Sequence, residues 1–141
     1  KVSKGFYDTS LSDEELENAL VYFEGVYRPN DGIDYTKDNE DFEVYASASG
    51  TVVRKENDSL LGWIVTIEHQ KGLQTVYQSL DIKVEKGDQV KQGDLIGKAG
   101  NNVYQSSLKK HVHFIVSIND QTVNPNKYFG QKIEKIKTTS W

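Results

Sequence analysis

The amino-acid sequence predicts an all-β domain preceded by one short helix. Segments rich in β-branched and aromatic residues alternate with Gly, Asn and Asp turns from about residue 28 onward, which is the pattern of short strands. Two Gly-Asp turns lie six residues apart, so neighbouring strands must fold over one another in a compact sandwich or barrel. Helical spacing of apolar residues is confined to one stretch before residue 24.

A helix is predicted from Ser12 to about Phe23. Ser12 and Glu15 fit a capping box, in which each side chain accepts a hydrogen bond from the backbone N–H of the other residue. The apolar residues that follow recur at helical spacing: Leu16, Ala19, Leu20 and Phe23. Such a stripe usually packs against the protein, and Gly25 is expected to end the helix.

The central part of the chain contains the predicted strands. They are Phe42–Ala46, Thr51–Arg54, Trp63–Glu68, Leu73–Tyr77, Leu95–Gly100 and Phe114–Ile118. A polar loop is expected at Lys55–Ser59, and tight turns at Gln70–Gly72 and at Asn119-Asp120, which precedes Thr122–Asn124. Gln131–Trp141 has no strand pattern and is expected to trail outside the core.

An internal repeat supplies the two Gly-Asp turns. Val84–Asp88 is echoed six residues later by Val90–Asp94, and each unit ends in Gly-Asp. Glycine adopts positive φ without steric cost, and aspartate can accept a hydrogen bond from the backbone of its own turn. Each unit is therefore predicted to reverse the chain.

Composition excludes several classes of function. The 17 basic and 21 acidic residues give a formal charge of −4 with no basic stripe, which argues against nucleic acid as a partner. Without cysteine there is no disulfide and no thiolate metal site. The sequence shows no signal peptide and no apolar run long enough to span a membrane. The opening Lys1–Lys4 is compatible with an excised fragment that has an anchor upstream.

The pair His111 and His113 is the strongest chemical signal. Residues two apart on a strand point to the same face, so the two imidazoles form half of a metal or acid–base site. The chain has only three histidines. The third, His69, precedes a turn and is expected to be an ordinary turn residue without a metal role.

The order of several motifs resembles the M23 (LytM-type) metallopeptidase domain. In sequence they are Gly32-x-Asp34, Ala46-x-x-x-Gly50-x-Val52, Tyr77-x-x-Leu80, the Gly-Asp turns, His111-x-His113-Phe114 and Val123-Asn124-Pro125. The resemblance implies a barrel-sandwich with a large antiparallel sheet whose groove holds zinc in active members. It divides the chain into an N-terminal extension at residues 1–27, a main domain at residues 28–129 and a tail at residues 130–141.

The resemblance also assigns five site positions. In active members two histidines and an aspartate hold zinc, and two further histidines activate the water that cleaves peptidoglycan peptides. The three metal positions correspond here to Asn30, Asp34 and His113, and the two catalytic positions to Ser79 and His111. Two of the five have therefore changed, and the resemblance implies a vestigial site.

The changed positions predict a protein that is not an enzyme and has no zinc cofactor. A catalytic zinc takes three protein ligands plus water, whereas Asp34 and His113 supply two and the neutral amide of Asn30 is a poor third. Ser79 cannot replace an imidazole as a proton carrier near neutral pH. His111 and His113 are then expected to hydrogen-bond to neighbours that include Asp34 and Ser79.

Within this family, Lys4–Asp8 and Asn30–Asp34 look like a sporulation member of endospore-forming bacteria. That resemblance implies a single-pass anchor upstream and an extracytoplasmic location at the outer face of the forespore membrane. It also implies a scaffold role during engulfment. The implied partner, across the intermembrane space, is the outer domain of the mother-cell membrane protein stage III sporulation protein AH.

Three alternatives differ in class. The first is an active zinc-dependent peptidoglycan endopeptidase with an unusual site. The second is a non-catalytic module that binds peptidoglycan in the old groove. The third is a biotinyl or lipoyl carrier, which is discounted because Ala99–Asn102 offers no lysine at a hairpin tip. For a scaffold, the candidate partner surfaces are sheet edges, the predicted helix and the loop at Lys109-Lys110.

Overall fold

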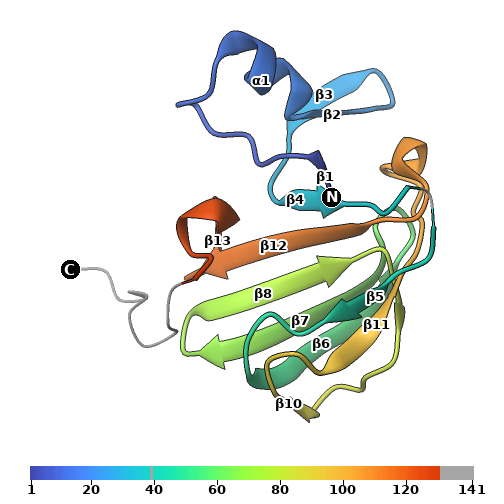
Figure 1. The fold of residues 1–141 in the computed structure, drawn as a ribbon, viewed down its shortest axis with the longest axis vertical. Helices are drawn as coiled ribbons and strands as arrows, with labels where there is room; N and C mark the ends of the chain where they lie inside the picture. The colour runs from blue at the N-terminus through green and yellow to red at the C-terminus, as the bar shows by residue number, and fades with distance from the viewer. Residues whose placement is uncertain (39, 131–141) are drawn as a thin grey trace.

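The computed structural model describes residues 1–38 and 40–130, and an eight-stranded antiparallel sheet forms its main body (Figure 1). The strand order is β1-β4-β12-β8-β7-β6-β10, with β13 paired to β12 off this path. The bounds are β1 Val2–Lys4, β4 Ile33–Tyr35, β6 Gly50–Asp58, β7 Gly62–Gln70, β8 Leu73–Gln78, β10 Gln89–Val90, β12 Val112–Ile118 and β13 Gln121–Val123.

A second, three-stranded sheet packs over part of the first. Its order is β5-β11-β9, with β5 at Glu43–Tyr45, β11 at Leu95–Ala99 and β9 at Leu80–Ile82. Side chains of both sheets meet in one apolar core, to which β5 contributes Val44, β11 contributes Ile96 and the large sheet contributes Val65, Ile67 and others. The predicted all-β fold with a large antiparallel sheet is confirmed.

The N-terminal residues form a small lobe above the large sheet (Figure 1). It contains helix α1 at Asp13–Asn18 and a two-stranded sheet made of β2, Leu20–Phe23, and β3, Val26–Pro29. Two short 3₁₀ turns complete the described elements, η1 at Ser106–Leu108 and η2 at Pro125–Lys127.

The helix prediction is right at its start and wrong at its end. The capping box is present, with Glu15 N–H donating to Ser12 Oγ and Ser12 N–H donating to Glu15 Oε1. The helix stops at Asn18, and the predicted continuation to Phe23 is instead β2. Glu24 and Gly25 both have positive φ, 50° and 77°, so they form a two-residue hairpin turn of the kind that suits antiparallel strands.

The predicted Gly-Asp turns are confirmed and nearly identical. Asp88 Oδ2 accepts from Glu85 N–H at 2.9 Å, and Asp94 Oδ2 accepts from Lys91 N–H at 2.8 Å. The glycine before each aspartate has positive φ, 96° and 89°. Each aspartate thus closes its own turn, and the repeat is structural.

Most predicted strands are present, with one loop misplaced. Lys55–Asp58, predicted as part of a polar loop, continues β6 and pairs with β7, so the connection shortens to Ser59–Leu61. The turns at Lys71-Gly72 and Asn119-Asp120 are confirmed as hairpin connections. Gln131–Trp141 lies outside the described residues, so the boundary of the tail remains a prediction. In the described part of the chain, no helix has the length and apolar character needed to cross a membrane.

Candidate functional site

Strands β4 and β12 bring Asp34 and His113 together. The strands are antiparallel, and Asp34 is the direct register partner of His113. Opposed residues share one face of a sheet, so the carboxylate and the imidazole meet. His113 Nδ1 lies 2.8 Å from Asp34 Oδ1, and the two residues are only 3% and 0% exposed. The expected contact between His113 and Asp34 is confirmed.

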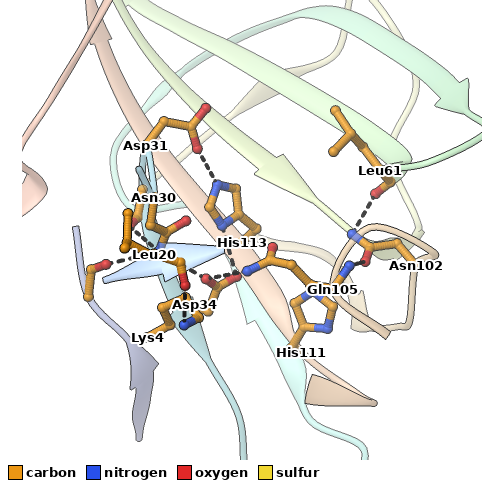
Figure 2. A network of polar contacts seen from close by, with 12 residues as sticks. Lys4, Leu20, Asn30, Asp31, Asp34, Leu61, Asn102, Gln105, His111 and His113 are labelled. Carbon is orange, nitrogen blue, oxygen red and sulfur yellow. Dashed lines mark hydrogen bonds and ion pairs between the residues drawn. The ribbon is translucent and has the colours of Figure 1, made fainter. Parts of the chain in front are cut away.

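His113 bridges two carboxylates. Its Nε2 lies 2.6 Å from Asp31 Oδ1 while its Nδ1 faces Asp34 (Figure 2). Burial by itself lowers the pKa of His113, but the hydrogen bonds to Asp31 and Asp34 and their negative charges raise it to about 9. At neutral pH the ring is therefore an imidazolium that donates a hydrogen bond from each nitrogen.

Two side-chain amides hold the other oxygen of Asp34. Asn30 Nδ2 donates to Asp34 Oδ2 across 3.1 Å, and Gln105 Nε2 donates to it across 2.9 Å. Asn30 Nδ2 also lies 2.9 Å from the carbonyl oxygen of Gly32 and 3.0 Å from that of Gly5. Each amide in this cluster therefore points its hydrogens at an oxygen atom.

Asn30 also joins the N-terminal lobe to the large sheet through its backbone. Its N–H donates to the carbonyl of Ala19 at 2.9 Å, and its carbonyl accepts from Tyr7 N–H at 3.0 Å. Lys4 Nζ donates to the carbonyls of Asn18 and Leu20, at 3.1 and 2.8 Å, where α1 ends and β2 begins. Asn30, which the resemblance predicts to stand at a zinc-ligand position, thus connects the N-terminal residues to the large sheet.

This arrangement does not fit a zinc ion. Zinc ligands present lone pairs to the metal, so imidazole must be neutral and the carboxylate must have a free oxygen. Here both nitrogens of His113 face carboxylates, and both oxygens of Asp34 accept N–H donors. Among residues 1–38 and 40–130, no group of three His, Cys, Asp or Glu side chains is placed to hold a metal ion.

His111 has different partners from His113. Its Nδ1 lies 2.8 Å from the carbonyl oxygen of Lys109, so Nδ1 carries the proton and Nε2 keeps a lone pair. Burial lowers the pKa of His111, which keeps the ring neutral. Its Nε2 is buried and has no hydrogen-bond partner.

Ser79 is held by its backbone, and its hydroxyl makes no hydrogen bond. Its N–H donates to the Trp63 carbonyl at 3.0 Å, and its carbonyl accepts from Gly100 N–H at 2.7 Å. These bonds hold Ser79 at a φ of 72°, and its buried Oγ has no partner. The expected hydrogen bond from the histidine pair to Ser79 is therefore wrong.

His69 is neither a turn residue nor part of this site. It lies within β7, where Nδ1 is 2.8 Å from the Ser49 carbonyl oxygen and Nε2 is 2.8 Å from Thr75 Oγ1. Burial lowers its pKa. The ring ties β7 to the chain before β6 and to β8, so the expected place of His69 in a turn is corrected.

Sequence reasoning missed two members of the cluster, Asp31 and Gln105. Asp31 lies within Asn30–Asp34, but the resemblance gives its carboxylate no role. Gln105 lies 71 residues from Asp34, and nothing in its local sequence marks it. It is placed by Asn102, whose Oδ1 accepts from Gln105 N–H at 2.8 Å and whose Nδ2 donates to the Leu61 carbonyl at 3.1 Å (Figure 2).

Comparisons with known proteins agree with this picture. The model of Peptidase family M23 matches residues 28–125. Stage II sporulation protein Q of Bacillus subtilis (strain 168) is 45% identical over 138 residues, which are 96% of this chain and 49% of that protein. The chain therefore spans about half the length of that relative.

The chain is also similar to a subunit of a solved complex and to an enzyme. A chain in the structure of the SpoIIQ–SpoIIIAH pore forming complex has a TM-score of 0.91 and 45% identity, covering 98% of this chain and 90% of that chain. The DD-carboxypeptidase/endopeptidase Mpg of Neisseria meningitidis serogroup B is 33% identical over 99 residues, which are 70% of this chain and 22% of that protein.

Proposed function

The chain belongs to peptidase family M23, as its motifs predicted, and on that premise we propose that it is a non-catalytic member acting as a protein-binding scaffold. Its proposed partner is the outer domain of a SpoIIIAH-type protein of the mother cell, met across the intermembrane space during engulfment. The location that accompanies this role is extracytoplasmic, at the forespore membrane, with the membrane anchor outside residues 1–141.

The partner assignment is supported by similarity along nearly the whole chain. Identity of 45% over 96% of the chain, together with a TM-score of 0.91 to a chain of the SpoIIQ–SpoIIIAH complex, covers the N-terminal lobe as well as the sheet. Residues 1–27 lie outside the match to the peptidase family model. The similarity to the sporulation relative therefore includes the N-terminal lobe, most of which lies outside the region matched by the family model.

The observation that supports loss of peptidase chemistry is the hydrogen bond from Asn30 to Asp34. A third zinc ligand at residue 30 would have to present a lone pair, whereas the Asn30 amide presents hydrogen to the carboxylate. At the catalytic position, Ser79 offers a hydroxyl that cannot carry protons near neutral pH. We assign Asn30, Asp34 and His113 to a former metal site, and Ser79 and His111 to former catalytic positions.

Mixing this chain with the SpoIIIAH outer domain tests the scaffold role. Size-exclusion chromatography with light scattering should show a complex at micromolar concentrations. The sporulation scaffold assignment would be abandoned if the two proteins elute separately at all concentrations up to about 100 μM, since specific pairs of standard interface size bind more tightly than this. A pulldown on purified cell wall, run in parallel, separates the scaffold from a peptidoglycan-binding module.

The family relationship itself favours a second candidate, an active zinc endopeptidase. The 33% identity to Mpg lies within the same domain. An active enzyme must retain close to one equivalent of zinc after purification. Elemental analysis that finds less than about a tenth of an equivalent, together with intact cell-wall peptides after incubation, would exclude it.

A further inference from the structure

The β2–β3 hairpin packs against the protein mainly through one face of β2, whereas all four residues of β3 are exposed. In its register Phe23 pairs with Val26 and Tyr22 pairs with Tyr27, and paired residues share a face. On the packed face Val21 is buried, and the Phe23 ring contacts Tyr104 edge-on with centroids 5.4 Å apart. The opposite face, which we call the tyrosine face, consists of Leu20, Tyr22, Tyr27 and Pro29.

The tyrosine face exposes an aromatic pair to solvent. Tyr22 is 59% exposed and Tyr27 is 66% exposed, and their ring centroids are 4.7 Å apart. Tyrosine rings offer a large, rigid contact area that loses little conformational entropy on binding, and tyrosine is enriched at the centres of protein interfaces.

The two edges of this hairpin differ. At the outer edge of β2, Lys4 Nζ donates to the Leu20 carbonyl at 2.8 Å and so occupies that edge. No strand of the described chain pairs with the outer edge of β3. Phe23 and Val26 flank a two-residue turn, so they form a hydrogen-bonded pair across the hairpin. The next pair, Tyr22 and Tyr27, is therefore a non-hydrogen-bonded pair, and the backbone N–H and C=O of Tyr27 point away from β2.

The charge around the tyrosine face is mainly negative, although Lys4 lies at the edge of β2 and Arg28 lies within β3. Residues 5–27 contain no Lys or Arg. They contain six carboxylates, from Asp8, Asp13, Glu14, Glu15, Glu17 and Glu24. A second copy of this chain docked by the same face would bring two acidic helices together, which like charges oppose. The surface therefore favours a basic occupant over self-association.

From these features we infer that the tyrosine face and the outer edge of β3 bind the SpoIIIAH-type partner. An exposed strand of the partner pairs with β3, an apolar side chain packs on Tyr22 and Tyr27, and a Lys or Arg faces α1. This inference rests on the proposed scaffold function and deepens it by naming the surface. It is independent of the former metal site.

Calorimetric titration of the SpoIIIAH outer domain into variants of this chain tests the surface. Tyr22→Ser combined with Tyr27→Ser should weaken binding about tenfold or more, because both changes remove central aromatic contacts. Tyr45→Ser is the matched control, since Tyr45 is 51% exposed on β5, away from the hairpin, and should bind like the wild type. Glu14→Lys with Glu17→Lys should also weaken binding, while Glu→Gln at both positions should weaken it less.

The outcomes separate this inference from the proposed function. Wild-type binding that is unchanged in the tyrosine variant overturns the surface and leaves the scaffold function in place. Absence of wild-type binding overturns both. Circular dichroism checks the folding of each variant. Tyr27→Ser alone, which changes the more exposed ring of the pair, replaces the double variant should the latter unfold. If analytical sedimentation shows that the wild-type chain dimerises and that the tyrosine variant does not, the face binds a second copy of this chain, and the partner is overturned as its occupant.

Discussion

The side-chain amide of Asn30 donates a hydrogen bond to Oδ2 of Asp34 across 3.1 Å. Both residues are buried, and the resemblance to M23 peptidases predicts that they stand where active members have zinc ligands. An imidazole at residue 30 could bind a metal ion together with the carboxylate of Asp34, whereas the amide of Asn30 donates a hydrogen bond to that carboxylate directly. Asp34 thus accepts hydrogen bonds from two amides, and it shares the positive charge of the His113 imidazolium with Asp31.

Asn30→His is expected to leave the protein without peptidase activity. The new imidazole restores one ligand type, but Ser79 still lacks the imidazole needed for proton transfer. Gln105 and Asp31 would also remain bonded to Asp34 and His113. Chromatography of cell-wall peptides after incubation with the zinc-supplemented variant should show no cleavage.

The comparison variant carries both Asn30→His and Ser79→His, and so has an imidazole at both of the changed positions. Cleavage by the single Asn30→His variant would contradict the proposed role of Ser79. A zinc-binding titration of the same variants separates ligand recovery from catalysis. Asn30→His should also lower stability, because it removes the amide bonds to the Gly5 and Gly32 carbonyls.

Local patterns predicted those parts of the fold whose causes are local. The Gly-Asp turns close on their own aspartates, and the capping box joins residues three apart, so both are readable from sequence. Leu20–Phe23 fits helical and strand patterns alike, and the two-residue turn at Glu24-Gly25 decides for the strand. The resemblance to M23 motifs predicted that Asp34 and His113 belong to one site, and the register of β4 and β12 places them opposite one another.

The remainder of the site depends on contacts that sequence does not show. Gln105 reaches Asp34 only because Asn102 and Leu61 fix the loop before η1. Asn30 was assigned as a failed ligand, yet its bonds to Gly5 and Tyr7 give it a structural role that only the folded lobe shows. Replacement of a catalytic residue predicts a lost activity, but it does not predict what the new side chain contacts.

Gln105→Met should lower the free energy of unfolding by about 1–3 kcal/mol, because it removes a buried donor from an ionised carboxylate while keeping side-chain volume. Urea unfolding followed by tryptophan fluorescence measures this change. Gln89→Met is the control, since Gln89 is exposed on β10 and should change stability by less than about 0.5 kcal/mol. Equal effects at both positions would show that Gln105 does not support the cluster.

Alkaline pH should destabilise the protein through His113. The folded pKa is raised to about 9, above the unfolded value of about 6.5, so the folded state binds the extra proton. This contribution is fully present below about pH 6.5 and is lost as pH rises through about 9, with a total on the order of 3 kcal/mol. Proton NMR titration of the ring checks it directly, and a midpoint near 6.5 for His113 would show that the two carboxylates do not hold it charged.

Gly32→Ala should disrupt the pairing that brings Asp34 to His113. A Cβ at Gly32 would lie 2.3 Å from the Phe114 carbonyl oxygen, so β4 and β12 would have to separate. The expected loss in unfolding free energy is about 1–3 kcal/mol, measured by urea denaturation. Gly5→Ala is the matched control, because a Cβ there meets nothing within 4 Å and leaves the carbonyl that accepts from Asn30 unchanged. If Gly32→Ala is as stable as Gly5→Ala and keeps the His113 ring resonances of the wild type, then close approach at Gly32 does not set the geometry of the cluster.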